Sequence, residues 1–214
     1  MEFKGAIFDL DGVIVDTVPL HFKAWKKMFL EYGQEITFQD YKEKIDGIPR
    51  ISGARAILKD LSEDKLNQAA SRKQGYFLEF LEKEGVKVYP STLELIENLK
   101  NQKIKVAVIS ASKNCRFTLE KAGIDSLFDV IITGNDVKKG KPEPDVFLLA
   151  AEKLNLSPEV CIIVEDAVLG VLAAQRAGMR CVGIDRYQNP QRLAKANLVV
   201  NDLSEVTVEQ LKNL

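Results

Sequence analysis

Apolar residues follow two kinds of pattern along this chain. The run Ala6 to Phe8 has no polar residues alternating with it, which is typical of a strand buried on both faces of a parallel sheet. Other segments repeat apolar residues every three or four positions, as Leu20, Ala24 and Met28 do, which is typical of amphipathic helices. The chain is therefore expected to combine buried strands with surface helices.

The two patterns occupy different parts of the sequence. Residues 16–82 show helical periodicity without a clear strand, whereas strands and helices alternate after Gly85. Such alternation indicates parallel crossovers and an open α/β sheet with helices on both faces. The predicted strands are 6–8, 105–110, 130–133, 160–164, 181–184 and 198–200, and the predicted helices are 17–29, 41–45, 54–61, 64–84, 92–101, 114–122, 145–154 and 167–177.

These patterns predict two domains. Residues 1–15 and 83–214 are expected to form a core around the parallel sheet, and residues 16–82 an all-helical insert. A chain of 214 residues with 46% hydrophobic residues is long and apolar enough to bury both. The predicted fold class is therefore α/β.

Charge and composition argue against nucleic-acid and membrane partners. The 30 basic and 31 acidic residues nearly cancel, so no overall field attracts an anionic surface. No apolar run approaches the roughly 20 residues of a membrane span, and the first residues lack a signal-peptide pattern. Cys115, Cys161 and Cys181 have neither paired nor metal-ligand spacing. We expect a cytoplasmic monomer with reduced cysteines.

Two carboxylates follow the first predicted strand. Asp9 and Asp11 come just before Gly12, at the carboxyl end of that strand, which is where open parallel sheets bind their ligands. Both acids could equally be ordinary turn residues before a glycine. This motif alone leaves the two interpretations open.

Three further segments supply groups that would complement Asp9. Ser110 ends a strand and precedes a helix, so its hydroxyl can donate to a phosphate or cap that helix. Lys141 stands just before a proline-rich helix start. Glu165 and Asp166 end a second buried strand.

Four carboxylates at one edge of a sheet require a cation. Two unit charges 4 Å apart repel by about 4 kcal/mol at an effective dielectric near 20. Hard oxygen ligands suit Mg²⁺, which keeps several waters and bridges to phosphate, and Lys141 would neutralise one more charge. The same arrangement makes Asp9 a nucleophile toward phosphorus and Asp11 a general acid and base.

In their order along the chain, these motifs resemble the haloacid dehalogenase superfamily of phosphotransferases. The similar stretches are Phe8 to Val13, the strand end at Ser110, Gly140 to Pro142 and Glu165-Asp166, with an early helical insert. The resemblance implies a Rossmann-like core with an all-helical cap. It also implies an aspartyl-phosphate on Asp9, acid/base catalysis by Asp11, phosphate binding by Ser110 and Lys141, and Mg²⁺ bound by Asp9, the Asp11 carbonyl, Glu165 and Asp166.

Several further stretches narrow the resemblance within that superfamily: Asp16-Thr17, His21 to Trp25, Gly47 to Arg50, Arg72-Lys73, Tyr89-Pro90 and especially Ser110 to Asn114. With them the chain looks like the β-phosphoglucomutase-like subfamily, named for the enzyme that interconverts β-D-glucose 1-phosphate and glucose 6-phosphate through a bisphosphate. The resemblance implies that Arg50 binds the distal phosphate and that His21 and Lys73 flank the acid/base. By spacing alone, His21 could equally be a packed residue one turn before Trp25. The substrate-binding residues implied for this sugar phosphate are Thr17, His21, Gly47, Arg50, Lys73, Ser112, Lys113 and Asn114.

One residue departs from the subfamily pattern, and two other functions stay open. Asp46 precedes Gly47 where these mutases usually have lysine, which places a negative charge near the expected sugar phosphate. A Mg²⁺-dependent sugar-phosphate phosphatase would use the same catalytic residues but discharge Asp9 with water. A non-enzymatic phosphoacceptor signalling domain also combines acids, a lysine and Mg²⁺ on a parallel sheet, but it places its acidic pair before the acceptor.

Overall fold

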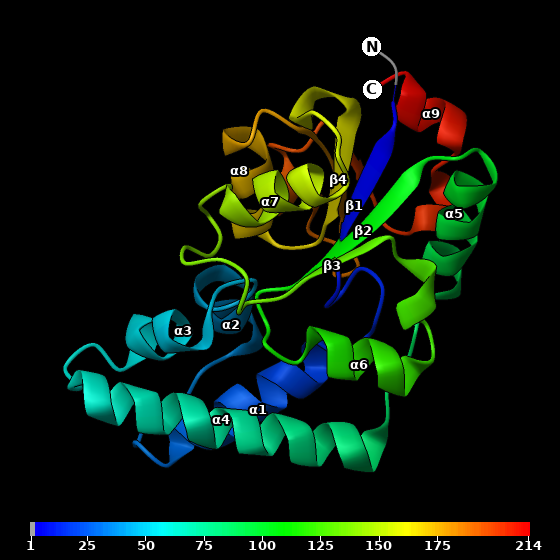
Figure 1. Ribbon diagram of the computed structural model, residues 1–214. Coiled ribbons are helices and arrows are strands. Elements are labelled where there is room, and N and C mark those ends of the chain that lie inside the picture. The colour runs from blue at the N-terminus through cyan, green and yellow to red at the C-terminus, as the bar shows by residue number, and fades with distance from the viewer. Residues whose placement is uncertain (1–2) are drawn as a thin grey trace.

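Within residues 3–214, which the computed structural model describes, six parallel strands form one sheet (Figure 1). The strands are β1 (Gly5–Asp9), β2 (Lys105–Ile109), β3 (Val130–Ile132), β4 (Cys161–Glu165), β5 (Arg180–Ile184) and β6 (Leu198–Val200). Their order across the sheet is β3-β2-β1-β4-β5-β6, so β1 lies between β2 and β4. The carboxyl ends of these three strands therefore lie side by side.

Helices pack on both faces of the sheet and also form a separate bundle. They are α1 (Val18–Leu30), α2 (Phe38–Lys44), α3 (Arg50–Ile57), α4 (Glu63–Glu84), α5 (Pro90–Asn101), α6 (Cys115–Ala122), α7 (Asp145–Lys153), α8 (Val168–Arg176) and α9 (Val208–Lys212). One face is covered by α7 and α8, and the other by α5, α6 and α9. The helices α1 to α4, called the helical cap below, lie beyond the carboxyl ends of the strands (Figure 1). The predicted α/β sheet with a helical insert is confirmed.

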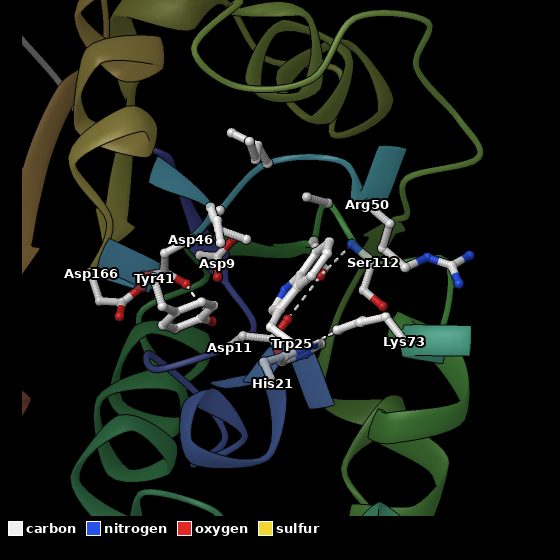
Figure 2. A pocket seen from close by; sticks show the side chains of 15 residues that line it. Asp9, Asp11, His21, Trp25, Tyr41, Asp46, Arg50, Lys73, Ser112 and Asp166 are labelled. Atoms are coloured by element: carbon white, nitrogen blue, oxygen red, sulfur yellow. Dashed lines mark hydrogen bonds and ion pairs between the residues drawn. The ribbon is translucent and has the colours of Figure 1, made fainter. Parts of the chain in front are cut away.

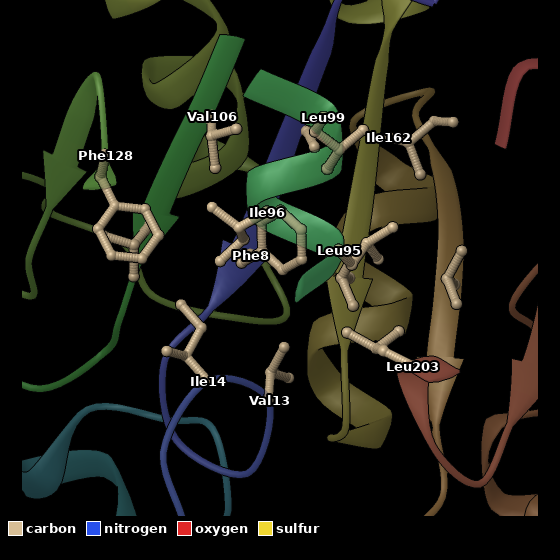
Figure 3. Packing of buried hydrophobic residues seen from close by; sticks show 14 of the residues in the cluster. Phe8, Val13, Ile14, Leu95, Ile96, Leu99, Val106, Phe128, Ile162 and Leu203 are labelled. Carbon is tan, nitrogen blue, oxygen red and sulfur yellow. The ribbon is translucent and has the colours of Figure 1, made fainter. Parts of the chain in front are cut away.

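Strand β1 shows why an unbroken apolar run predicts a sheet covered on both sides. Phe8 packs with Leu95 and Ile96 of α5 on one face (Figure 3), and Ile7 packs in the cluster that contains Phe147 of α7 on the other. Burying each such side chain stabilises the fold by about 1.5–3 kcal/mol. Since both faces are apolar, only the strand ends are left for polar chemistry.

The helical cap has an apolar core of its own. Trp25 and Phe29 of α1, Tyr41 of α2 and Leu66 of α4 are buried in a cluster separate from those of the sheet. The rings of Trp25 and Phe29 stack with their centroids 5.2 Å apart. The cap is thus packed as a unit. The boundaries 16–82 stay a prediction, and α4 itself continues to Glu84.

The limits of two cap helices differ from the sequence prediction, and one helix is missed. The segment predicted at 54–61 is helical over Arg50–Ile57, because it starts directly after Pro49 and Leu58 leaves the helical conformation. The segment predicted at 41–45 begins at Phe38, because Thr37 and Asp40 form a capping box. The sequence pattern does not predict α9, which has five residues and is too short for a clear period.

Two expectations from composition can be compared with the structure. Cys115, Cys161 and Cys181 are free and buried, as predicted. No helix within residues 3–214 combines the length and the apolar character that crossing a membrane requires.

Candidate active site

Four acids gather at the carboxyl edge of the sheet. Asp9 ends β1, Asp11 follows it in the loop, Glu165 ends β4 and Asp166 comes next. They are close enough for the charges of the other three to affect the pKa of Asp9. We call these four residues the acidic cluster. The paired registers of β1 and β4 bring them together although 154 residues separate Asp11 from Glu165 along the chain.

Gly12 allows the loop after β1 to approach β4. Its φ is +83°, and a Cβ atom at this position would lie 2.4 Å from Oδ2 of Asp166. Any side chain would therefore be both strained and in collision with a carboxylate. The loop that carries Asp11 needs glycine at this position to lie against Asp166.

Lys141 is the counterion of two members of the acidic cluster. Its Nζ donates to Oδ1 of Asp9 at 2.5 Å and to Oε1 of Glu165, and all three side chains are buried. Burial lowers the pKa of a lysine, but these two carboxylates outweigh it and raise the pKa of Lys141. Lys141 is therefore a fixed positive charge beside Asp9.

We expect Lys141→Ala to destabilise the protein. Asp9 and Glu165 would remain buried without their counterion, and removing one partner of a buried ion pair costs about 3–5 kcal/mol. The deficit should be larger at pH 8 than at pH 5, because buried acids take up protons at lower pH and the charge disappears. Urea denaturation at both pH values measures the free energy of unfolding. Lys139→Ala, at an exposed neighbour, is the control, and equal stability of the two variants would contradict this role.

Nearby lysines neutralise only part of the negative charge of the acidic cluster. Burial raises the pKa of Asp9 well above its ordinary value, although Lys141 opposes this. Burial also raises the pKa of Asp166 to about 7, against the opposing charge of Lys42. A raised pKa means that the site favours added positive charge, either as protons or as a cation.

The donor chemistry of the acidic cluster fits Mg²⁺, because its ligands are hard carboxylate oxygens. In this arrangement, however, lysine ammonium groups contact Asp9, Glu165 and Asp166. Among residues 3–214, no group of three or more His, Cys, Asp or Glu side chains is arranged to hold a metal ion. Metal binding by Asp9, Asp11, Glu165 and Asp166 thus stays a prediction, and it requires these carboxylates to exchange lysine contacts for the metal.

Asp11 accepts hydrogen bonds from three side chains. Thr17 Oγ1 donates to Oδ1, which also lies 3.2 Å from Nε2 of His21, and Ser110 Oγ donates to Oδ2 at 3.1 Å. Burial raises the pKa of Asp11, but His21 and the two hydroxyls outweigh it and lower the pKa to about 2. Asp11 is therefore ionised at neutral pH and is oriented from three sides.

His21 connects Asp11 to Lys73 on α4. Lys73 Nζ lies 2.6 Å from Nδ1 of His21. Because the ionised Asp11 can only accept, Nε2 of His21 donates to it, and Nδ1 of the neutral ring then accepts from Lys73. Burial, and to a lesser extent Arg50, lowers the pKa of Lys73 to about 7. The ring of His21 also stacks on Phe77 with centroids 4.0 Å apart, so this residue is both packed and hydrogen-bonded to the acid.

A small, partly open cavity of about 50 Å³ lies between the sheet edge and the helical cap (Figure 2). It has room for only a few water molecules. A sugar phosphate is much larger, so we expect the helical cap and the sheet edge to move apart when it binds. The cavity is lined by Asp9, Asp11, His21, Trp25, Tyr41, Ile45, Asp46, Gly47, Ile48, Arg50, Lys73, Ser110, Ala111, Ser112 and Asp166.

The loop between β2 and α6 carries four of the predicted site residues. Ser110 Oγ accepts from the backbone N–H of Ser112 at 3.0 Å, and Ser112 Oγ accepts from that of Asn114 at 3.1 Å. Ser110 therefore does not cap α6, which was its alternative role. The buried side-chain nitrogen of Asn114 has no hydrogen-bond partner among the described residues, so it can donate to a ligand. Lys113 is exposed and lines a second cavity of about 230 Å³ together with Arg50.

Arg50 lies at the far end of this cavity from Asp166 (Figure 2). It begins α3 and is partly buried. Its guanidinium donates to the carbonyl of Ala70 at 3.3 Å, and no salt bridge joins it to another residue within 3–214. Most of its donors are thus free for an anion.

The sequence analysis missed Lys42. Its buried Nζ donates to Asp46 and, at 2.9 Å, to Oδ2 of Asp166, while the hydroxyl of Tyr41 donates to the other oxygen of Asp46 at 2.8 Å. The negative charge noted at Asp46 is therefore paired within the protein. The only sequence signal is the spacing of four residues from Lys42 to Asp46, which is common for ion pairs on exposed helices.

Comparisons with known proteins identify the family. The model of the haloacid dehalogenase-like hydrolase family matches residues 6–184. The β-phosphoglucomutase of Bacillus subtilis is 35% identical over 97% of this chain and 93% of its own, and the phosphorylated carbohydrates phosphatase of Thermotoga maritima is 32% identical over 99% and 97%. The crystal structure of β-phosphoglucomutase from Clostridium difficile has a TM-score of 0.90 at 33% identity, over 99% of this chain and 96% of that one. The chain belongs to the haloacid dehalogenase superfamily and, within it, to the β-phosphoglucomutase-like subfamily.

Membership of this subfamily decides whether the protein is an enzyme or a non-enzymatic signalling domain. Relatives over the full length of the chain are named as a mutase and as phosphatases, so the protein is an enzyme, either an isomerase or a hydrolase. The hypothesis of a non-enzymatic phosphoacceptor domain is therefore rejected. The predicted superfamily and subfamily are both confirmed.

Proposed function

We propose that the protein is a β-phosphoglucomutase, which converts β-D-glucose 1-phosphate to glucose 6-phosphate through a bisphosphate and an aspartyl-phosphate on Asp9. One observation carries this proposal: a single cavity is lined both by Asp9, Asp11 and Asp166 of the acidic cluster and, at its other end, by Arg50. A substrate with two phosphates could contact both ends at once.

In this mechanism Asp11 acts first as a base. The 6-hydroxyl of β-glucose 1-phosphate loses its proton to the ionised Asp11, and its oxygen attacks the phosphorus carried by Asp9. The bond between Asp9 and phosphorus breaks, which gives the bisphosphate. The low pKa of Asp11 supports this order, because the carboxylate starts the step without a proton.

Asp11 acts as an acid in the second half of the cycle. The bisphosphate turns so that its 1-phosphate faces Asp9, and an Asp9 oxygen forms a new bond to that phosphorus. The bond to the sugar oxygen breaks, and Asp11 returns its proton to that oxygen, which releases glucose 6-phosphate. Bound Mg²⁺ would supply positive charge to the transferring phosphoryl group. Ser110 and Lys141 would bind its remaining oxygens.

The small cavity supports transfer to a sugar rather than to water. An aspartyl-phosphate is readily hydrolysed wherever water can reach it, and a cavity of about 50 Å³ has room for only a few water molecules beside Asp9. His21 and Lys73 of the cap contact Asp11 or its partner, so closure also completes the hydrogen bonds of the acid/base. Gly47 lines the cavity, and we propose that it contacts the substrate, whereas the predicted substrate contact of Thr17 is not supported, because Thr17 is buried, donates to Asp11 and does not line the cavity.

Arg50 is the proposed site for the second phosphate. A planar guanidinium binds phosphate oxygens with two parallel hydrogen bonds, and most donors of Arg50 are free. Ser112, Lys113 and Asn114 lie on the opposing loop of the core, and Lys113 shares a cavity with Arg50. Together they would hold the phosphate that is not reacting.

A Mg²⁺-dependent sugar-phosphate phosphatase is the second candidate. The Thermotoga maritima phosphatase resembles this chain nearly as closely as the Bacillus subtilis mutase does. Asp46 also lines the cavity at the position where the mutases usually have lysine, and its pairing with Lys42 leaves no free positive charge there for a sugar phosphate. Both activities would use the same catalytic residues and differ in whether a hydroxyl or water discharges Asp9.

A product-resolved assay tests the proposal. With Mg²⁺ and a trace of glucose 1,6-bisphosphate, we expect the wild type to convert β-glucose 1-phosphate to glucose 6-phosphate faster than it releases phosphate. Arg50→Ala should reverse this preference, because the second phosphate loses its partner. Hydrolysis of acetyl phosphate should change little, since this small substrate does not reach Arg50.

The matched control is Arg55→Ala, at an exposed arginine on the same helix. It should leave the ratio of the two products unchanged. Phosphate release from many sugar phosphates with no glucose 6-phosphate formed would exclude the mutase and favour the phosphatase.

A further inference from the structure

A buried ion-pair group joins the helical cap to the acidic cluster. Lys42 of α2 contacts Asp46 in the cap and, at 2.9 Å, Oδ2 of Asp166 in the core. The side chains of Lys42, Asp46 and Asp166 are only 4%, 6% and 5% exposed. Tyr41 adds a neutral hydrogen bond to Asp46. One ammonium is thus shared between two buried carboxylates from different layers of the molecule.

The carboxylate that Lys42 contacts in the core is also a proposed metal ligand. A lysine ammonium is a compact cation on a flexible stem, so it can lie at a carboxylate oxygen much as a metal ion would. Two cations at the same oxygen repel each other, and burial strengthens that repulsion. Lys42 and Mg²⁺ therefore cannot both remain at Oδ2 of Asp166 without a strong penalty.

Lys42 can lose its contact with Asp166 and still keep its ion pair with Asp46. Both residues belong to the helical cap, and their contact does not depend on the core. If the cap moves away, Lys42 keeps Asp46 as its counterion, and no lone charge is left buried in the cap. Asp166 is then free to bind a metal.

We propose that Lys42 is a positioning residue that occupies the cation position at Asp166 in the metal-free enzyme, so that Mg²⁺ binding displaces it and weakens the hold of the cap on the core. This inference rests on the magnesium site of the proposed function. By thermodynamic linkage the effect is reciprocal: opening the cap strengthens Mg²⁺ binding as much as Mg²⁺ favours opening.

The test measures Mg²⁺ binding directly, by calorimetric titration of the whole protein without substrate. Lys42→Met should bind Mg²⁺ about tenfold more tightly than wild type, within the usual range of coupling between sites. Lys44→Met is the matched control, because Lys44 lies on the same helix, is exposed and pairs with Asp40. Its Mg²⁺ affinity should equal that of wild type.

A second variant excludes a folding defect. Lys42→Met leaves Asp46 buried without a partner, so the double variant with Asp46→Asn removes that charge as well. Asp166 also loses its counterion, so the double variant should unfold at a temperature close to wild type only with Mg²⁺ present, and it should still bind Mg²⁺ more tightly. Amide hydrogen exchange in α2 gives a separate measure: Mg²⁺ should speed it in wild type and leave it unchanged in the double variant.

The outcomes separate this inference from the proposed function. Equal Mg²⁺ affinity of wild type and both Lys42 variants would overturn the role of Lys42 and leave the magnesium site intact. Absence of Mg²⁺ binding in every protein would overturn both. The distinction between mutase and phosphatase does not affect either measurement, because no substrate is present.

Discussion

Asp9→Asn should reduce turnover by about 10⁴-fold or more, the scale of loss expected when a covalent nucleophile is removed. The amide keeps the size of the side chain and can still contact Lys141, so the local fold should survive. It lacks the anionic oxygen that would attack phosphorus. Turnover of β-glucose 1-phosphate and of acetyl phosphate should fall together, because both reactions pass through phosphorylated Asp9.

The control for this variant is Asp185→Asn. Asp185 is also buried and also directly follows a strand of the same sheet, but it does not line the cavity that contains Asp9. It should retain turnover within a few fold of wild type. If Asp9→Asn kept turnover near that of wild type, Asp9 would not be the nucleophile and the proposed aspartyl-phosphate would be wrong.

Asp11→Asn should reduce turnover by about 10² to 10⁴-fold, the usual contribution of a positioned general acid or base. The amide oxygen can still accept from Thr17 and His21, and the amide nitrogen can donate to Ser110, so the loop should keep its place. The side chain can no longer take or return a proton. The backbone carbonyl, which is the proposed metal ligand, is unchanged.

Two measurements on this variant separate the two roles of Asp11. Mg²⁺ affinity, measured by calorimetry, should stay close to wild type while the rate of the chemical step falls. The reverse result, with weaker Mg²⁺ binding and an unchanged rate of the chemical step, would show that Asp11 binds the metal. The general acid and base would then have to be another residue.

The central part of the fold is predictable because its signal is local. The run from Ala6 to Phe8 identifies a strand covered on both faces, and Asp9 stands at its end. Parallel strands share one carboxyl edge, so predicting the strands also predicts that Asp9, Ser110 and Glu165 meet. This prediction does not depend on how many residues connect one strand to the next.

The contacts of the cap are less predictable because they depend on how two domains pack. Lys42 and Asp166 are 124 residues apart and belong to different layers, and no periodicity relates them. The limits of α3 are also set by Pro49 and Leu58 rather than by the apolar pattern. His21 could be predicted in part. Its spacing along the helix predicts that the ring is packed, but its contact with Asp11 follows only from the position of the cap on the core.

The small volume of the cavity also affects how measured constants should be interpreted. If the closed arrangement predominates, a sugar phosphate associates only with the fraction of molecules that are open at a given moment. The apparent dissociation constant then equals the intrinsic one divided by that fraction, and the association rate falls in proportion. KM would then include the equilibrium between the open and closed positions of the cap, and residues that never contact the sugar would contribute to substrate affinity.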